Sequence, residues 1–584
     1  MPAMDGSGVY VGLPWWGAMK MHWLENQVVI AFQSDTPLPT DLNAAKYTLA
    51  KAIGLNEFMK FIQSRGFELA LIDEMTHLFP SPSGHGTTAI CTFNVNATGT
   101  YHDMQDTRML PGVDSSDGSS TRKVVKLIHY SLPKLRQQGK IPVVAAMPNW
   151  LSSSAQIGCI TGGGPAVPPS PVPQTDVCSS SPGFWPITVP ALSSAPSGLA
   201  DKHGDGVTVF VLDTMPQMQP SNAVAEAAKR AGDHNKLLAM IAAQMDRAQS
   251  PFIKCSYQTL PAPLLETAQD QLSTGRDVNR QIYGYTMPDH GLFVTGIIRD
   301  LAPAANIEYI RVLNDFGVGD VGTLISALRT IHQRMMSGGD LYNKPVVINL
   351  SLMVGPHDAD LPMVWLNDSS YQASDFTEMM SNVKLLRSIL HHVIQCLAAN
   401  GAVIVAAAGN DSNNPDTPQR VGPDYPAAFP EVIAVGSVDR SGNAASYSNY
   451  PRTGPQDNGI ATYGGGIPTL DALKTDKGID ALRGVYCSSL YPELIATDNH
   501  QPGYDPQNPN GWAYWSGTSF ATPIVSAIAA RILQLKAASL PIPQRAAEVQ
   551  RLLTTAAGQQ EIFGKPLDLQ PDFGVSLLKA EQAS

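Results

Sequence analysis

From residue 207 onward, short runs of apolar residues without polar alternation recur along the chain, and segments with helical spacing separate them. Strands buried on both faces have continuous apolar runs, whereas amphipathic helices repeat apolar residues every three to four positions. The predicted strands are 207–212, 306–313, 345–350, 402–408 and 432–436, and the predicted helices are 221–248, 294–298, 321–336, 388–397 and 521–535. This alternation predicts an α/β fold, with a doubly wound and mostly parallel sheet covered by helices on both faces.

The first 150 residues carry a different pattern, in which the predicted order is strand, helix, strand, strand, helix, strand. The segments in that order are 26–32, 43–64, 68–72, 88–94, 122–138 and 141–147. The second helix is predicted although it contains Pro133. This order is that of a ferredoxin-like α+β domain, which therefore precedes the predicted α/β sheet.

A change in composition separates the two patterns. Serines open the stretch after residue 151, three glycines follow at 162–164, and prolines recur between 165 and 173. Such a stretch buries little apolar area and is typical of a surface insertion or a cleavable connector. Because 584 residues exceed one ordinary core, we predict an N-terminal domain over 1–150, a Gly/Ser/Pro-rich linker or processing region over 151–182, and a larger domain over 183–584.

Composition and charge narrow the class of protein. The hydrophobic share of 43% and the charged share of 15% are those of a folded globular protein. The 39 Lys and Arg against 50 Asp and Glu give a net charge of −11, which argues against a nucleic-acid partner. The six cysteines are too sparse for a disulfide scaffold and lack zinc-like spacing. Only Cys159 and Cys178, which flank the Pro-rich stretch, suggest a disulfide.

The start of the sequence has no basic segment followed by an uninterrupted apolar stretch, and no run of about 18 apolar residues occurs anywhere along it. We therefore predict no signal peptide and no membrane span. These features favour a cytoplasmic or non-classically exported protein, or a secreted one whose signal was already removed; the location is otherwise undetermined.

Three polar residues stand where a predicted strand ends or a predicted helix begins. Asp213 ends an apolar strand, His290 opens an apolar helical run, and Ser519 precedes the helix from Ala521. A serine hydroxyl is a useful nucleophile only if a base takes its proton, and a histidine base needs an acid on its other nitrogen. Each residue alone has an ordinary structural explanation. Together, in this order along the chain, they predict a catalytic Asp-His-Ser triad.

Two further residues lie beside this set. Asn410 follows the strand 402–408 in the run Ala-Ala-Gly-Asn, where its amide could donate to a developing oxyanion, although Gly-Asn is also a routine turn dipeptide. Asp289 directly precedes His290. We expect Asp289 to be a solvated charge and not the orienting acid, because an exposed neighbouring carboxylate rarely fixes an imidazole.

These segments resemble the motifs of the subtilase family, the subtilisin-like serine peptidases. Asp213-Thr214 is similar to the family's Asp motif, His290-Gly291 to its His motif, and Gly517-Thr-Ser519 to its Ser motif. The run ending in Asn410 resembles its oxyanion segment. The resemblance spans about residue 183 to the end of the chain. Beyond the triad and the oxyanion donor, it implies these substrate-binding residues: Ser351, Leu352, Met353, Ala408 and Gly409.

The same resemblance identifies residues 24–150 as similar to the family's propeptide. It implies that this N-terminal domain acts as an intramolecular inhibitor and that the processing site lies within the linker. Family members often bind calcium, so a structural calcium ion is possible here, but the metal-binding residues are unknown. The chemistry itself requires no cofactor.

The sequence departs from the family pattern at several positions. Leu292 and Phe293 replace a small residue and a second histidine, Met215 replaces a glycine, and Met353 stands where glycine is common, which would narrow the cleft. The 76 residues between Asp213 and His290 imply an insertion at about 216–283. Such an insertion could cap the cleft, bind a partner or redirect the acyl-enzyme.

The function that these observations favour is a serine endopeptidase, made as a self-processing zymogen, that acts on a polypeptide substrate. One alternative is a dedicated precursor-peptide maturation protease or peptide cyclase, which product masses would distinguish. Another is a non-catalytic subtilase-like binding protein. The presence of all four residues, Asp213, His290, Asn410 and Ser519, argues against that last alternative.

Overall fold

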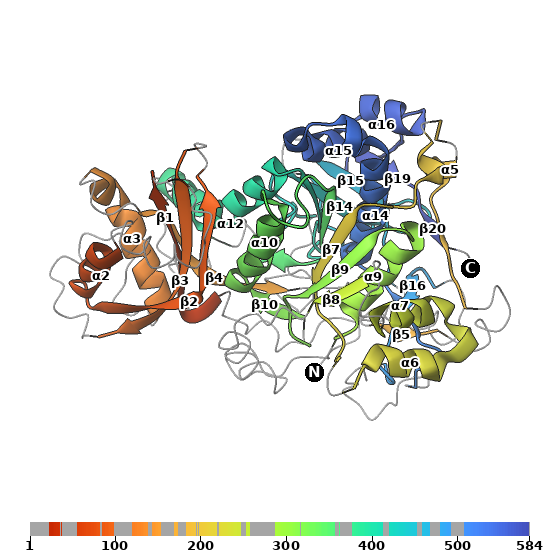
Figure 1. Cartoon of the computed structure of the whole chain (residues 1–584), viewed down its shortest axis with the longest axis horizontal. Helices are drawn as coiled ribbons and strands as arrows, with labels where there is room; N and C mark the ends of the chain where they lie inside the picture. The colour runs from red at the N-terminus through yellow and green to blue at the C-terminus, as the bar shows by residue number, and fades with distance from the viewer. Residues whose placement is uncertain are drawn as a thin grey trace.

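The computed structural model shows a small N-terminal domain packed against a larger domain (Figure 1). Helices α10 (Val321–Met335) and α12 (Phe376–Ala399) of the larger domain lie nearest the contact. The structure describes residues 23–35, 37, 55–81, 85–98, 119–137, 143–153, 169–172, 183–193, 195–196, 198–218, 221–246, 253–256, 287–315, 317–356, 361, 376–412, 420–452, 458–467, 479–491 and 507–582.

The larger domain is built on a nine-stranded sheet with the order β18-β19-β15-β14-β13-β11-β7-β9-β8. Every neighbouring pair is parallel except β18 and β19. The strands are β7 (Thr208–Asp213), β8 (Ile253–Ser256), β9 (Asn306–Arg311), β11 (Val346–Leu350), β13 (Ala402–Ala407), β14 (Val432–Val438), β15 (Gly459–Tyr463), β18 (Asp568–Gln570) and β19 (Val575–Leu578). The mostly parallel sheet predicted from the apolar runs is confirmed.

Helices cover both faces of this sheet. Along β7, Val209 and Val211 pack into the core that contains α9 (His290–Leu301), α14 (Thr518–Lys536) and α15 (Arg545–Thr554). The intervening Phe210 and Leu212 pack into the opposite core, with α10 (Val321–Met335) and α12 (Phe376–Ala399). Successive side chains of a strand point to opposite faces, which explains why these strands are apolar throughout.

The remaining described α-helices and β-strands of this domain lie outside the nine-stranded sheet and its main covering helices. They are β5 (Ser170–Pro171), β6 (Ile187–Thr188), α5 (Pro190–Ser193), α6 (Ala223–Ala231), α7 (Lys236–Asp246), β10 (Val318–Asp320), β12 (Met353–Val354), β16 (Leu482–Val485), β17 (Trp512–Trp515), α16 (Ala556–Phe563) and β20 (Glu581–Gln582). One helical stretch, Thr518–Ser539, is apolar and long enough to cross a membrane, but 89% of its most apolar window is buried inside the domain. It is the central core helix.

The N-terminal domain is a four-stranded antiparallel sheet in the order β4-β1-β3-β2, covered by two helices (Figure 1). In chain order its elements are β1 (Trp23–Ser34), α2 (Leu55–Gln63), β2 (Phe67–Pro80), β3 (Thr87–Ala97), α3 (Ser120–Gln137) and β4 (Val143–Ser153). The helix predicted over 43–64 is described only from residue 55 onward. Apolar residues of the strands and both helices form a core continuous with the α10 and α12 side of the larger domain.

The contact between the two domains buries two histidines of the larger domain against Phe79 of β2. The ring centroids of His332 and His392 lie 5.4 and 6.1 Å from that of Phe79. His332 Nδ1 is 2.8 Å from Arg329 Nη1. Burial, together with Arg329, lowers the pKa of His332 to about 3, and burial lowers the pKa of His392 to about 4. Both rings are therefore neutral at neutral pH.

We expect the free energy of unfolding to fall as the pH drops from about 6.5 toward 4. In the unfolded chain each histidine has a pKa near 6.5, so between these values the unfolded state binds more protons than the folded state. The stabilisation is complete above the unfolded pKa and is lost on acidification. Denaturation midpoints at successive pH values measure the slope. A His392→Gln variant should show a shallower slope than the wild type, and an unchanged slope would contradict this assignment.

Strand β4 continues beyond the N-terminal domain and enters the larger one. Ser153, Ser152 and Leu151 pair antiparallel with Val318, Gly319 and Asp320 of β10. On its other side, Ser153 and Ser152 pair antiparallel with Met353 and Val354 of β12. Farther along the segment predicted as a linker, β5 pairs with β17. Parts of that segment are therefore strands, because edges of the larger domain supply their hydrogen-bond partners.

The insertion after Asp213 forms two helices where the sequence predicts one helical segment over 221–248. The break falls at Gly232, whose φ of 55° lies in the left-handed region, so α6 ends there and α7 begins after a short turn. Asn235 Nδ2 donates to Gly511 O (2.6 Å), and Trp512 Nε1 donates to His234 O (2.8 Å). The described part of the insertion thus supports β17, the strand that leads to Ser519. Residues 257–286 lie outside the described part.

Candidate active site

Asp213 and His290 form a buried pair at the carboxyl end of the sheet. Asp213 is the last residue of β7 and His290 the first of α9, and both are fully buried. His290 Nδ1 lies 2.8 Å from Asp213 Oδ1, which also accepts a hydrogen bond from Thr214 N (2.6 Å). Because a carboxylate oxygen only accepts, Nδ1 carries the proton and Nε2 keeps its lone pair. Among the described residues, Nε2 has no hydrogen-bond partner.

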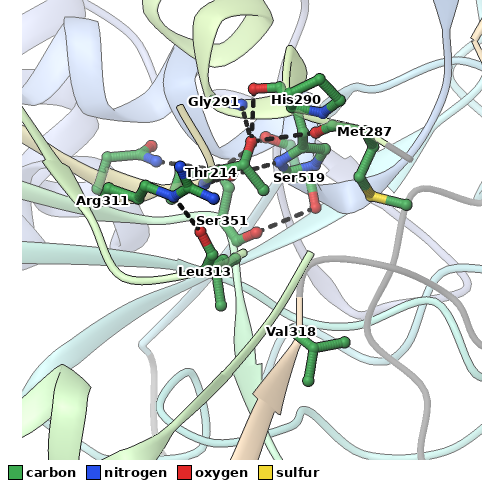
Figure 2. Close-up of polar contacts among 12 residues, drawn as sticks. Thr214, Met287, His290, Gly291, Arg311, Leu313, Val318, Ser351 and Ser519 are labelled. Atoms are coloured by element: carbon green, nitrogen blue, oxygen red, sulfur yellow. Dashed lines mark hydrogen bonds and ion pairs between the residues drawn. The ribbon is translucent and has the colours of Figure 1, made fainter. Parts of the chain in front are cut away.

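Thr214 fixes the approach of α9 to β7. Its hydroxyl lies within hydrogen-bond distance of the carbonyls of Met287 (3.1 Å) and Pro288 (3.0 Å), and it accepts from Gly291 N (3.2 Å) (Figure 2). A Cβ atom at Gly291 would lie 2.6 Å from Asp213 Cβ and 2.1 Å from Tyr309 Oη. Only glycine permits this close packing, which sets the position of the imidazole.

Ser519 lies in the first turn of α14, next to the helix start at Thr518. Its hydroxyl is 3.4 Å from Ser351 O, and Ser351 Oγ donates to Ser519 O (2.8 Å) (Figure 2). Pro523, in the second turn, has no N–H to donate to the carbonyl four residues earlier, which is that of Ser519. The helix begins earlier than predicted, so this proline leaves the Ser519 carbonyl open to Ser351.

The structure brings Asp213 and His290 into contact, but it does not join Ser519 to them by a hydrogen bond. The described contacts pair Ser519 Oγ with Ser351 O, and His290 Nε2 has no described partner. The imidazole packs against Phe520, the residue after Ser519, with ring centroids 5.2 Å apart. In catalytic sites such bonds are often long or absent before substrate binds, and a serine hydroxyl can rotate about χ1.

Asn410 follows β13 and is held by the start of α14. Its Oδ1 accepts from Thr518 N (3.0 Å) and Thr518 Oγ1 (2.9 Å), and its side chain is buried. These two bonds fix the amide plane. Asn410 Nδ2 has no hydrogen-bond partner among the described residues. A buried donor without an acceptor costs about 1–3 kcal/mol, which is tolerated where a ligand oxygen completes the site.

The predicted substrate-binding residues lie on two segments beside Ser519. Met353, expected to narrow the cleft, lies in β12 and pairs with Ser153 at the end of β4. Gly409 has a φ of 109°, and a Cβ atom there would lie 2.0 Å from Asp424 Oδ2. Glycine is required at that position. The other members of the predicted set, Ser351, Leu352 and Ala408, are fully or almost fully buried.

The expectation that Asp289 is a solvated charge is wrong. Asp289 is fully buried, and its carboxylate accepts from Cys487 N (3.0 Å), Ser488 N (3.0 Å) and Ser488 Oγ. Burial raises the pKa of this carboxyl group above its usual value. Local sequence patterns do not indicate this contact, because the two partners lie almost 200 residues downstream. Asp289 ties the start of α9 to the segment after β16.

We expect Asp289→Asn to lower the free energy of unfolding by about 1–3 kcal/mol, because an amide NH2 would face a backbone N–H and leave it unpaired. Chemical denaturation measures the change. Asp315→Asn is the matched control: this side chain is half-exposed and, among the described residues, pairs only with Arg311, so its replacement should cost less than about 1 kcal/mol. Equal effects of the two variants would contradict the anchoring role.

Phe293, which replaces the second histidine of the family motif, belongs to the core beneath the site. It is fully buried, and its ring centroid lies 4.6 Å from Phe520 and 5.6 Å from Trp515. A Cβ atom at Gly484 would lie 2.6 Å from the Phe293 ring.

Among the described residues, no group of three or more His, Cys, Asp or Glu side chains could hold a metal ion. Cys159 and Cys178, the suggested disulfide, lie outside the described part.

Comparison with known proteins defines the class. The model of the subtilase family matches residues 204–573, and the chain belongs to this family. It is 26% identical over 257 residues to the subtilisin-like protease PopC of Myxococcus xanthus, covering 43% of this chain and 42% of that protein. It is 28% identical over 181 residues to subtilisin DY of Bacillus licheniformis, covering 30% and 51%. The matches thus span about half the length of these relatives or less.

Among solved structures, the chain is similar to a cold-adapted subtilisin-like serine proteinase. The sequence identity is 20% and the TM-score is 0.30, over 60% of this chain and 82% of that one.

Proposed function

We propose that the protein is a serine endopeptidase in which Ser519 is the nucleophile, His290 the general base and Asp213 the residue that orients the imidazole. The observation that carries this proposal is the buried Asp213–His290 contact of 2.8 Å, which leaves Nε2 as a proton acceptor. The position of Ser519 at the start of α14 supports it, since the positive end of the helix dipole favours negative charge there.

The proposed reaction has two halves. Ser519 Oγ attacks the carbonyl carbon of the scissile peptide while His290 Nε2 takes the hydroxyl proton. The imidazolium returns that proton to the leaving amine, the C–N bond breaks, and an ester to Ser519 remains. Water then attacks this ester, His290 takes its proton and returns it to Ser519, and the carboxylic acid is released. Asp213 stabilises the imidazolium in both halves.

Asn410 is the proposed oxyanion donor. Its Nδ2 is buried and has no partner among the described residues, while Thr518 holds its Oδ1 by two hydrogen bonds. An amide aimed in this way stabilises the tetrahedral intermediate without having to reorganise during the reaction. The backbone N–H of Ser519 is the proposed second donor.

We further propose that the N-terminal domain is a ferredoxin-like propeptide that inhibits the enzyme from within the chain. Its strand order β4-β1-β3-β2 and its two helices support the comparison. The end of β4 lies between β10 and β12, where a substrate strand would pair. Asn149 Oδ1 also accepts from Gly322 N (2.8 Å) in the first turn of α10, which helps to dock the domain.

The course of β4 suggests where the chain is cut. Ser153, the last described residue of this strand, lies opposite Met353. The carbonyl of Ser351, two residues before Met353, is the group 3.4 Å from Ser519 Oγ. Because β4 runs toward Ser519, self-processing is predicted within the region 151–182 identified from composition.

A serine-directed fluorophosphonate probe tests the proposed function. The wild type should gain the mass of the probe on the peptide that contains Ser519, whereas Ser519→Ala should gain none. Product masses from a peptide substrate then separate hydrolysis, which adds one water, from transfer to an amine, which adds none. A wild type that neither reacts with the probe nor cleaves peptides would contradict the proposal.

A further inference from the structure

The end of strand β4 buries alternate side chains in the larger domain. Trp150 and Ser152 are fully or almost fully buried, whereas Leu151 and Ser153 between and after them are only partly buried. Side chains of a strand alternate between its two faces. One face of this strand therefore packs against the larger domain.

Trp150 packs against a cationic and aromatic site formed by Arg387 of α12 and by Tyr425. Its Nε1 donates to Leu386 O (3.2 Å), and the guanidinium of Arg387 lies 5.3 Å from the centre of its ring. Arg387 is itself held over Tyr425, at 4.7 Å, and donates to Gly355 O at 2.8 Å. A guanidinium stacked between two aromatic rings and fixed by a carbonyl is an ordered platform for an aromatic side chain.

Ser152 occupies a small subsite that provides no described polar partner. It lies between Gly319 of β10 and Val354 of β12, and a Cβ atom at Gly319 would be 3.0 Å from Ser152 Oγ and 3.1 Å from Leu313 Cδ2. Ser152 Oγ is buried and has no hydrogen-bond partner among the described residues. A small apolar side chain therefore suits this subsite at least as well as serine does.

We propose that the substrate site selects polypeptide segments in which an aromatic residue is followed two positions later by a small residue, with alanine preferred to serine. Arg387 and Gly319 determine this specificity. The inference rests on the proposed peptidase function and names the substrate class of the same site. The N-terminal strand occupies the cleft as a template of that substrate.

Backbone hydrogen bonds of the bound strand supply the part of its affinity for the larger domain that does not depend on its side chains. β4 pairs with both β10 and β12, and Gly355 N donates to Leu151 O (3.1 Å). In strand-addition complexes of this kind, backbone hydrogen bonds hold the peptide and pockets for alternate side chains select it. Positions 151 and 153 should therefore tolerate replacement.

Peptides with the sequence of residues 146–158 test the proposal on the active enzyme. Ala at the position of Trp150, or Leu at that of Ser152, should lower kcat/KM at least about tenfold, because the first loses a buried ring and the second overfills a closed subsite. Ala at the position of Ser152 should raise it by about two- to tenfold. The matched controls, Ala at 151 and Leu at 153, should change it less than about threefold.

Full-length variants provide a second readout that does not depend on peptide cleavage. Ser152→Leu should displace the strand and raise the rate of probe labelling at Ser519 by about tenfold, whereas Ser153→Leu should leave that rate near the wild-type value. Circular dichroism checks that both variants fold. Equal responses at 152 and 153, in peptides or in the full chain, would overturn the specificity proposal. Absence of labelling and cleavage in every variant would instead overturn the peptidase function.

Discussion

Replacing His290 by alanine should lower kcat/KM by a factor on the order of 10⁶, because members of a catalytic triad act as a unit. Without the imidazole no described group takes the proton of Ser519. Asp213→Asn should cost on the order of 10⁴-fold, since an amide at 2.8 Å from Nδ1 would favour the wrong tautomer. Steady-state cleavage of a peptide substrate measures both losses.

His203→Ala is the matched control for this experiment. The side chain is exposed, and its described hydrogen bonds use only backbone atoms of that residue. Its replacement should leave kcat/KM within about twofold of the wild type. If His290→Ala kept more than about one hundredth of the wild-type rate, His290 would not be the general base.

Replacing Asn410 by alanine should lower kcat by about 10²–10³-fold and leave KM nearly unchanged. The Nδ2 donor would act on the oxyanion of the transition state and not on the bound ground state, so its loss appears in kcat. Asn410→Asp tests the same point with almost the same shape, because a carboxylate cannot donate. Pre-steady-state or steady-state kinetics with a saturable peptide separate the two constants.

Thr518→Val distinguishes donation by Asn410 from a purely structural role. It removes the hydroxyl that donates to Asn410 Oδ1 at 2.9 Å but keeps the backbone N–H that donates at 3.0 Å. The amide would be held less firmly, and kcat should fall by about threefold to tenfold, less than in Asn410→Ala. A rise in KM with unchanged kcat in either variant would contradict the oxyanion role.

Local sequence patterns are sufficient to predict Asp213, Asn410 and Ser519 as members of the candidate site. Asp213 and Asn410 each follow a continuous apolar run, and the carboxyl ends of parallel strands lie at the same edge of a sheet. Ser519 stands in a run of small residues that opens an apolar helix. These features need only a few consecutive residues to be recognised.

Contacts between residues that are distant in the sequence cannot be predicted from local patterns. Asp289 was expected in solvent because its two partners, Cys487 and Ser488, are distant in sequence. The extension of β4 through Leu151–Ser153 was missed because serines rarely signal a strand, and here the hydrogen bonds come from the edges at β10 and β12. In both cases tertiary structure supplied what the local sequence lacked.

The intact mass of purified wild type beside Ser519→Ala tests the central claim most directly. We expect the wild type to separate into two fragments by cleavage within residues 151–182, whereas Ser519→Ala should remain one chain. That result would identify Ser519 as the nucleophile and the N-terminal domain as its first substrate. Cleavage of both proteins at the same bond would contradict the claim, and so would a wild type that stays whole and unreactive toward the serine-directed probe.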